Sequence, residues 1–294
     1  DGLLVGRAIQ GADAISAAIT ALLSDLTRPQ VRTKGMALVG ISIAAMFALS
    51  LLIAPPLAAR IGLSGLFGLT AFMALLGVML TLFGVPAEPA RARSTSGWID
   101  LKAVVQNGTL LRLDWGVWSL HTVQIAMWMG VPALLVQAGL ASAEHWKLYL
   151  PALVASILVL GGVLFRLERK GHMKSVMLFS IALLALVQLG LIGAGQSQIG
   201  ILGMGLLLFG FFLAFNALEA SQPSLVSKLA PAHQRGAALG VFNTAQSLGF
   251  FTGGAAGGAL LQWGGTTLLY GACAALLVVW WWFARRLDLS QATH

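Results

Sequence analysis

Long apolar stretches, separated by short polar connections, recur along the whole sequence. A helix needs about 20 mostly apolar residues to cross the hydrocarbon core of a bilayer. Nine stretches reach that length and predict nine transmembrane helices, at 3–23, 36–55, 63–84, 113–136, 148–166, 175–194, 199–222, 236–261 and 266–284. The pattern therefore predicts an all-α fold and a polytopic membrane protein.

One connection is longer and more polar than the others. Residues 86–111 mix basic side chains with apolar ones such as Trp98 and Ile99, which predicts a short helix lying at the membrane surface. We expect this segment to link an N-terminal part, 1–85, to a C-terminal part, 112–294.

Composition and charge agree with a membrane protein. Hydrophobic residues make up 58% of the chain and charged residues 10%, against about a quarter charged in soluble domains. Of the 18 Lys and Arg residues, fifteen fall in alternate connections on one side of the predicted bundle, and only Arg60 and Lys147 on the other. The positive-inside rule makes the first side cytoplasmic, so we expect the linker and the C-terminus there. Basic residues placed between spans predict the lipid bilayer as a partner, and no nucleic acid.

A short pattern occurs twice in the chain, each time after a span and before a helix rich in small residues. The matching residues are Leu22, Ser24, Leu26 and Arg32 in the first copy and Leu225, Ser227, Leu229 and Arg235 in the second. Parallel repeats of this kind are typical of the two halves of major facilitator transporters. Six spans would form the second half and three the first, so we expect three N-terminal spans to be missing. The 294-residue chain alone should then be unstable in its first spans and should not transport.

Several segments resemble a known family. The pattern Leu3-x-x-x-Arg7-x-x-Gln10-Gly11 resembles the fourth-helix motif of the drug:proton antiporters in the major facilitator superfamily. Segments 6–12, 24–27, 143–150 and 215–219 resemble the YajR-like inner-membrane transporters. The resemblance implies a major facilitator fold that lacks the first three of its twelve transmembrane helices. Helices four to six would lie in 1–85 and helices seven to twelve in 112–294.

The same resemblance implies a function. It implies proton-coupled efflux of a small organic solute or drug across a bacterial inner membrane by alternating access, with small organic solute and protons as partners. The protein would be a monomer when full-length. Two departures from the motifs leave metabolite uptake open as an alternative: Asp13 stands in place of a glycine, and Ala54 precedes Pro55 where antiporters have Gly-Pro.

Four ionisable side chains inside the predicted spans are the proton-coupling candidates: Arg7, Asp13, His121 and Glu219. Even mild insertion scales assign a cost of about 2.5–3.5 kcal/mol to Arg or Asp at the centre of a helix in the membrane. This cost favours an interior cavity as the place of these side chains. Each has a structural alternative. Arg7 could snorkel to the headgroups, Asp13 could make a local contact, His121 could be a packing residue, and Glu219 could be a structural carboxyl near a proline break.

Two further groups complete the expected sites. His121 shares a helical stripe with Asp114, Trp118, Gln124 and Trp128, which suggests a cavity wall. The expected cavity-lining residues are Gln10, Asn216, Gln124, Trp128, Asn243 and Gln246. The expected conformational-switch residues are Asp25, Glu168, Arg169 and Gly171. The last three resemble the family's Asp-Arg-x-Gly-Arg signature, and Asp25 matches an acid that pairs with a loop arginine in relatives.

Two other classes remain as alternatives. The sequence Gly62-Leu63-Ser64-Gly65 resembles the GxSG of rhomboid-type intramembrane proteases, although a glycine-serine turn also explains it. A truncated, non-transporting membrane protein is the other class. With one cysteine, Cys273, and no CxxC or HxxxH spacing, we expect no metal and no cofactor. We therefore expect a protein that is not an enzyme.

Overall fold

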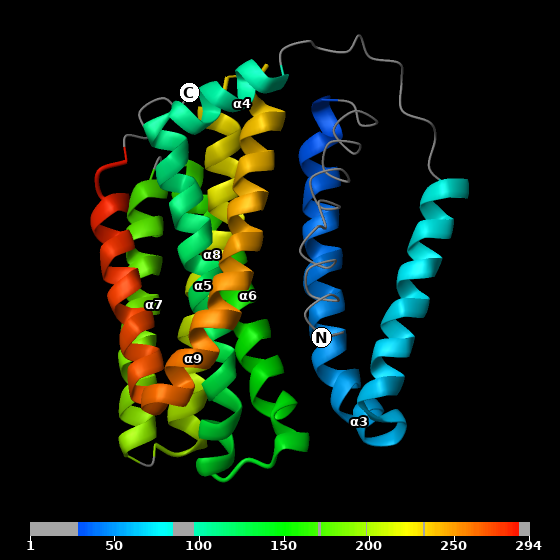
Figure 1. The fold of residues 1–294 in the computed structure, drawn as a ribbon, viewed down its shortest axis with the longest axis vertical. Helices are drawn as coiled ribbons and strands as arrows, with labels where there is room; N and C mark the ends of the chain where they lie inside the picture. The colour runs from blue at the N-terminus through cyan, green and yellow to red at the C-terminus, as the bar shows by residue number, and fades with distance from the viewer. Residues whose placement is uncertain (1–28, 85–96, 170–171, 198, 232, 288–294) are drawn as a thin grey trace. The chain divides into compact units, whose positions relative to one another are not determined.

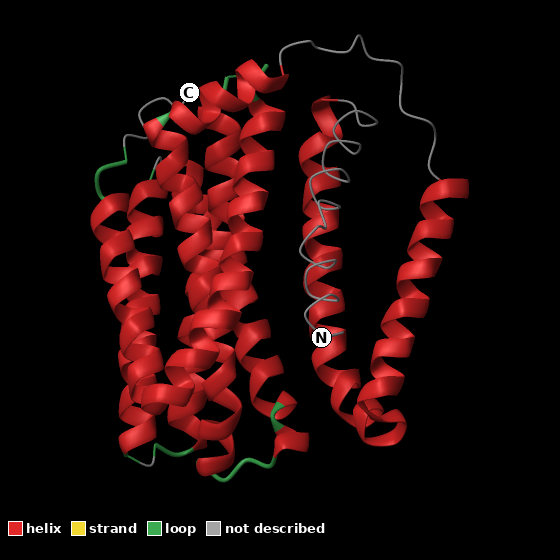
Figure 2. Cartoon of the chain, in the orientation of Figure 1, coloured by secondary structure: helices red, strands yellow, loops and turns green. Residues whose placement is uncertain are grey.

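The computed structural model describes residues 29–84, 97–169, 172–197, 199–231 and 233–287. Within these ranges every regular element is a helix, which confirms the predicted all-α fold (Figure 2). The helices are α3 (Pro29–Gly84), α4 (Gly97–Gln106), α5 (Gly108–Gln137), a short 3-10 helix (Ser142–Glu144), α6 (Trp146–Arg169), α7 (Met173–Gln196), α8 (Ile201–Leu229) and α9 (Arg235–Ala284). Among the described residues, six helices are long and apolar enough to cross a membrane. The predicted span 3–23 lies outside the described residues.

Helix α3 contains two predicted spans, 36–55 and 63–84, joined by a sharp turn. Gly62 has a φ of 69°, a backbone conformation that only glycine adopts without strain. The chain turns back there between the blue and cyan arms of α3 (Figure 1). Ser64 follows the turn and is exposed, which agrees with a glycine-serine turn.

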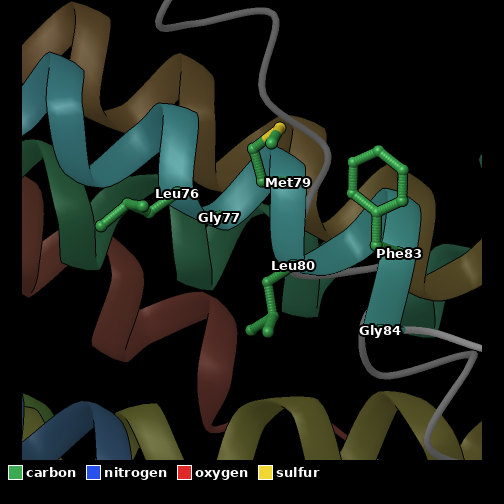
Figure 3. Close-up of a pocket in the computed structure, with 6 residues that line it drawn as sticks. All are labelled: Leu76, Gly77, Met79, Leu80, Phe83 and Gly84. Atoms are coloured by element: carbon green, nitrogen blue, oxygen red, sulfur yellow. The ribbon is translucent and has the colours of Figure 1, made fainter.

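The last turns of α3 carry a shallow apolar hollow. Its lining is Leu76, Gly77, Met79, Leu80, Phe83 and Gly84 (Figure 3). No side chain in this set can donate a hydrogen bond or titrate, so the hollow offers no chemistry of its own.

Helices α4 to α9 form a bundle in which α5 is central. Helix α5 packs against both α9 and α8, while α7 packs against α8 and α9, and α6 packs against α8. Side chains such as Val117, Val123 and Met127 on α5 are fully buried. Helix α4, in the predicted linker, packs against α5 and α9 and therefore belongs to this bundle.

Helix α9 contains the predicted spans 236–261 and 266–284, separated by a kink at Gly264 and Gly265. Gly265 has a φ of 64°, so glycine again makes the turn. The predicted ends of α9 and α5 agree with the structure to within a few residues. Helix α8 differs, because it continues through Pro223 to Leu229 rather than ending at residue 222.

The first half of α9 lies against α5 through glycines spaced four residues apart. A Cβ atom built on Gly249 would stand 2.7 Å from the carbonyl oxygen of Trp118, and one on Gly253 would stand 2.6 Å from that of Thr122. One on Gly257 would stand 2.9 Å from a Cα atom of α5. Close approach of this kind is typical of small residues where transmembrane helices pack together.

Candidate functional site

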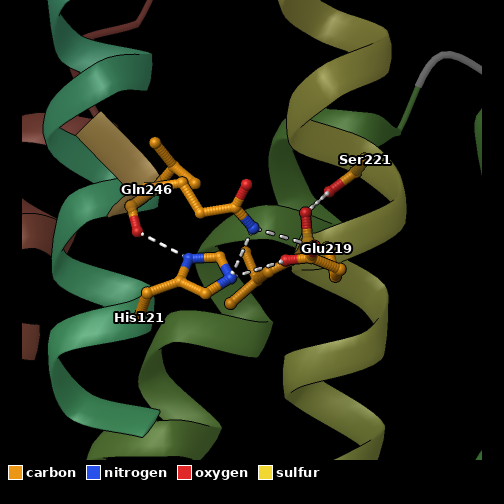
Figure 4. Close-up of polar contacts among 6 residues, drawn as sticks. His121, Glu219, Ser221 and Gln246 are labelled. Carbon is orange, nitrogen blue, oxygen red and sulfur yellow. Dashed lines mark hydrogen bonds and ion pairs between the residues drawn. The ribbon is translucent and has the colours of Figure 1, made fainter. Parts of the chain in front are cut away.

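Three polar side chains from three helices of the bundle contact one another: His121 on α5, Glu219 on α8 and Gln246 on α9 (Figure 4). Nε2 of His121 lies 3.3 Å from Oε2 of Glu219 and 2.8 Å from Nε2 of Gln246. The same amide nitrogen of Gln246 lies 3.4 Å from Oε1 of Glu219. One imidazole nitrogen, one carboxylate and one amide therefore form a closed triangle.

The backbone fixes which nitrogen of His121 can titrate. Nδ1 lies 2.9 Å from the carbonyl oxygen of Val117, one turn earlier on α5. A carbonyl oxygen can only accept a hydrogen bond, so Nδ1 carries a hydrogen and donates it. The proton that His121 gains or loses is therefore on Nε2, the nitrogen that faces Glu219.

Burial differs sharply between the two ionisable groups. His121 is 2% exposed, whereas the side chain of Glu219 is 42% exposed on the surface of the bundle. The carboxylate is thus open on the surface of this bundle, while the imidazole can exchange a proton only through its neighbours. The pair joins an exposed position to a buried one.

Aromatic rings surround the imidazole on the sides that the polar groups leave free. The ring of Phe250 lies 4.8 Å and that of Phe215 lies 5.8 Å from the ring of His121, both edge to face. Phe215 stacks on Phe211, which in turn packs against Trp128. Apolar walls lower the local dielectric, so hydrogen bonds within the triangle are stronger than in water.

Comparison with known proteins gives the family. The sequence matches the Major Facilitator Superfamily over residues 2–254 and again over 166–292. The chain belongs to this superfamily.

Two curated relatives show the extent of the similarity. The chain is 38% identical over 256 residues to "Inner membrane transport protein YajR" of Escherichia coli K12, which covers 86% of this chain and 56% of that protein. It is 27% identical over 256 residues to "Uncharacterized transporter BU466" of Buchnera aphidicola subsp. Acyrthosiphon pisum, which covers 86% of this chain and 65% of that protein. The chain thus spans between about half and two thirds of the length of these relatives.

In this member of the major facilitator superfamily, the structure brings together two of the four proton-coupling candidates. His121 and Glu219 lie in one site, although 97 residues separate them in the sequence. The other two, Arg7 and Asp13, lie outside the described residues. The structural alternative for Glu219 assumed a helix break at Pro223, but the helix continues through this residue. Proline has no N–H, so the main-chain carbonyl of Glu219 does lose its helical donor.

The expected cavity-lining residues have separate environments. Gln246 joins the triangle. Nδ2 of Asn216 donates to Ser156 on α6 at 3.3 Å, Trp128 packs among aromatic rings, and Gln124 has a buried amide oxygen without a partner. Asn243 is half-buried, and its main-chain carbonyl accepts a hydrogen bond from Ser247. Gln10 lies outside the described residues, and the lining role stays a prediction for the whole set.

Two of the four expected switch residues, Asp25 and Gly171, lie outside the described residues. Glu168 and Arg169 form the end of α6, and their side chains are not described. Their switch role therefore stays a prediction.

The structure also places two buried polar side chains that are not among the expected site residues. Asp114 lies on α5, two turns from His121, and its Oδ2 atom is buried without a partner. Gln222 on α8 is 1% exposed, and neither amide atom has a partner. The stripe on α5 already contained Asp114, but nothing in the sequence marked Gln222. Within the described ranges, no group of three His, Cys, Asp or Glu side chains could hold a metal ion.

Proposed function

We propose that the protein is a proton-coupled secondary transporter that exports a small organic solute across a bacterial inner membrane by alternating access. The observation that carries this proposal is the pairing of Nε2 of His121 with the half-exposed carboxylate of Glu219 at 3.3 Å. A proton bound between these atoms changes the charge of the site from −1 to zero. A site whose charge changes in this way can bind a proton and a solute alternately.

Superfamily membership and the inner-membrane name of the Escherichia coli relative support the membrane and the mode of transport. The direction rests on the resemblance of the Arg7 segment to drug:proton antiporters. Half-exposure of Glu219 supports access from a solute path, since the carboxylate is open on the surface of its own bundle.

The test removes the titration while keeping the shape. Glu219→Gln keeps the size of the side chain but cannot take up a proton at physiological pH. We expect the full-length protein, with the three N-terminal spans expected to precede this chain, to accumulate in proteoliposomes at least one member of a panel of fluorescent organic dyes, beginning with ethidium, when a pH gradient is imposed. Glu219→Gln should abolish this pH-driven accumulation.

Glu144→Gln is the matched control, because Glu144 is exposed and pairs with Lys147 in the turn before α6. It should transport as the unmodified protein does. Undiminished pH-driven transport by Glu219→Gln would remove Glu219 from the mechanism. Reversing the imposed gradient distinguishes export from uptake.

We also propose that the linker and the C-terminus are cytoplasmic, which is supported by the fifteen basic residues on that side. In a Cys273→Ala background, a membrane-impermeant thiol reagent added outside intact cells should label Ala141→Cys and not Ser94→Cys. Labelling of Ser94→Cys from outside would contradict this orientation.

A further inference from the structure

Two groups of the triangle compete for the same atom, Nε2 of His121, and the proposed function does not require this competition. The neutral imidazole of His121 donates from Nδ1 to Val117, so Nε2 has one lone pair to offer. Two groups point at that lone pair: the amide nitrogen of Gln246 at 2.8 Å and the carboxylate of Glu219 at 3.3 Å. An N–H of Gln246 can use the lone pair, or a proton shared with Glu219 can use it, but both cannot.

We propose that Gln246 is a positioning residue that holds the site in its unprotonated state, and this proposal rests on the proposed proton coupling. In that state Gln246 donates one amide hydrogen to Nε2 of His121 and the other towards Oε1 of Glu219. The two hydrogens of one amide keep the lone pair and the negative carboxylate together. Without them these two groups would repel each other.

Entry of a proton reverses this arrangement. When Nε2 carries a hydrogen, it donates to Oε2 of Glu219, and an amide N–H of Gln246 directed at it would set donor against donor. A half-turn of the amide brings its oxygen to face Nε2–H instead. That orientation suits only the protonated ring, because in the neutral state the amide oxygen would face the lone pair of Nε2. The orientation of Gln246 therefore follows the proton.

The helices make this switch directional. Gln246 lies one turn before Gly249, where α9 is fixed against α5, so His121 and Gln246 belong to one rigid pair of helices. Glu219 lies on the third helix, α8. Binding of a proton thus exchanges the partner of α8 at this level, from the amide on α9 to the imidazole on α5.

Among the described residues, few other charges face the site. Between Arg235 and Arg285, α9 carries no charged residue, and α8 carries only Lys228 besides Glu219. On α5 the nearest ionisable residue on the same face is Asp114, about 10 Å along the helix axis from His121. Helices α6 and α7 carry their charged residues only in their terminal turns. Within the part of the chain that the structure describes, the proton affinity of the site is therefore set mainly by its three members.

The experiment measures protonation directly and needs no transported solute. The full-length protein, labelled with 15N in its histidines, is placed in lipid nanodiscs, and its histidine signals are followed by NMR as the pH is changed. The signal of His121 is assigned by its absence in His121→Asn. Gln246→Met keeps the length of the side chain and removes both donors, so the unprotonated state loses its support. We expect the titration midpoint of His121 to rise by about one pH unit, a roughly tenfold gain in proton affinity.

Two further variants make the result specific. Gln262→Met is the matched control, because Gln262 lies on the same helix and is exposed, and it should titrate as the unmodified protein does. Gln246→Glu adds a carboxylate beside Glu219 and should raise the midpoint more than Gln246→Met. If Gln246→Met does not fold, Gln246→Leu, which also removes both donors without adding a charge, carries the test.

The outcomes separate the two proposals. A midpoint in the Gln246 variants equal to or below that of the unmodified protein, with His121 still titrating, overturns the role of Gln246 and leaves the proton site intact. If the His121 signal does not titrate, or if its midpoint is unchanged in Glu219→Gln, then His121 and Glu219 share no proton. Either result overturns the proposed coupling together with this inference.

Discussion

Helix α5 meets its two main neighbours in different ways. Against α9 it offers backbone, and the glycines of α9 leave no room for a side chain beside Trp118 or Thr122. Against α8 it offers His121, whose partner is a carboxylate that can gain or lose a proton. The glycine part of the first contact is set by shape and does not depend on protonation. The second depends on the protonation of one pair of atoms. A bundle with both kinds of contact can keep its architecture while one contact changes.

The largest effect should come from filling the contact with α9. In Gly253→Ala the new methyl group would stand 2.6 Å from the carbonyl oxygen of Thr122, and neither backbone can yield without separating the helices. We expect a loss of about 3 kcal/mol in stability. Thermal unfolding in detergent, followed by fluorescence-detected size exclusion, measures it.

The adjacent glycine supplies the control. A Cβ atom built on Gly254 meets nothing within 4 Å among the described residues, and alanine favours a helix over glycine by about 1 kcal/mol. Gly254→Ala should therefore be neutral or slightly stabilising. Equal destabilisation by the two variants would show that the α5–α9 contact does not depend on close backbone approach.

A smaller effect should come from the polar bond within the same contact. Nε1 of Trp118 donates to Oγ1 of Thr252 at 2.9 Å. Trp118→Phe keeps an aromatic ring and removes the donor, which should cost about 1 kcal/mol. Thr252→Val should cost a similar amount, and the double variant little more than either alone. Additive losses in the double variant would indicate that the two side chains act independently.

The smallest effect on stability should come from the contact with α8. Glu219→Gln leaves an amide in place of a half-exposed carboxylate, so we expect its free energy of unfolding to differ from that of the unmodified protein by less than about 1 kcal/mol. The same variant should lose pH-driven transport. A large loss of stability would mean that the α5–α8 contact is structural, and the contrast between the two contacts would fail.

The sequence predicted the helices well because membrane spans have a required length and composition. The turns at Gly62 and Gly265 fall where the pattern placed the gaps between spans. The end of α8 was missed, since residues such as Ser227 and Lys228 are polar and hydropathy does not follow a helix beyond the apolar region. The helix continues there because its backbone hydrogen bonds do not require an apolar surrounding.

The site was only partly predictable. His121 and Glu219 were each selected because an ionisable group inside a span is costly. Their meeting could not be read from the sequence, because it depends on how α5, α8 and α9 pack. Gln246 and Asn243 looked alike in the sequence, and only the structure shows that Gln246 reaches both ionisable groups.

The central place of α5 has a consequence for how the protein is made. Synthesis runs from the N-terminus, so α5 enters the membrane before α8 and α9 exist. It is also less apolar than α7 and α8. During that interval Asp114, His121 and Gln124 have none of their later neighbours, and each is costly in lipid. The newborn α5 must therefore stay beside the insertion machinery, or shift its depth in the bilayer, until α9 arrives. Biogenesis of the bundle waits on its last long helix, and a ribosome that stops before α9 leaves an exposed polar span.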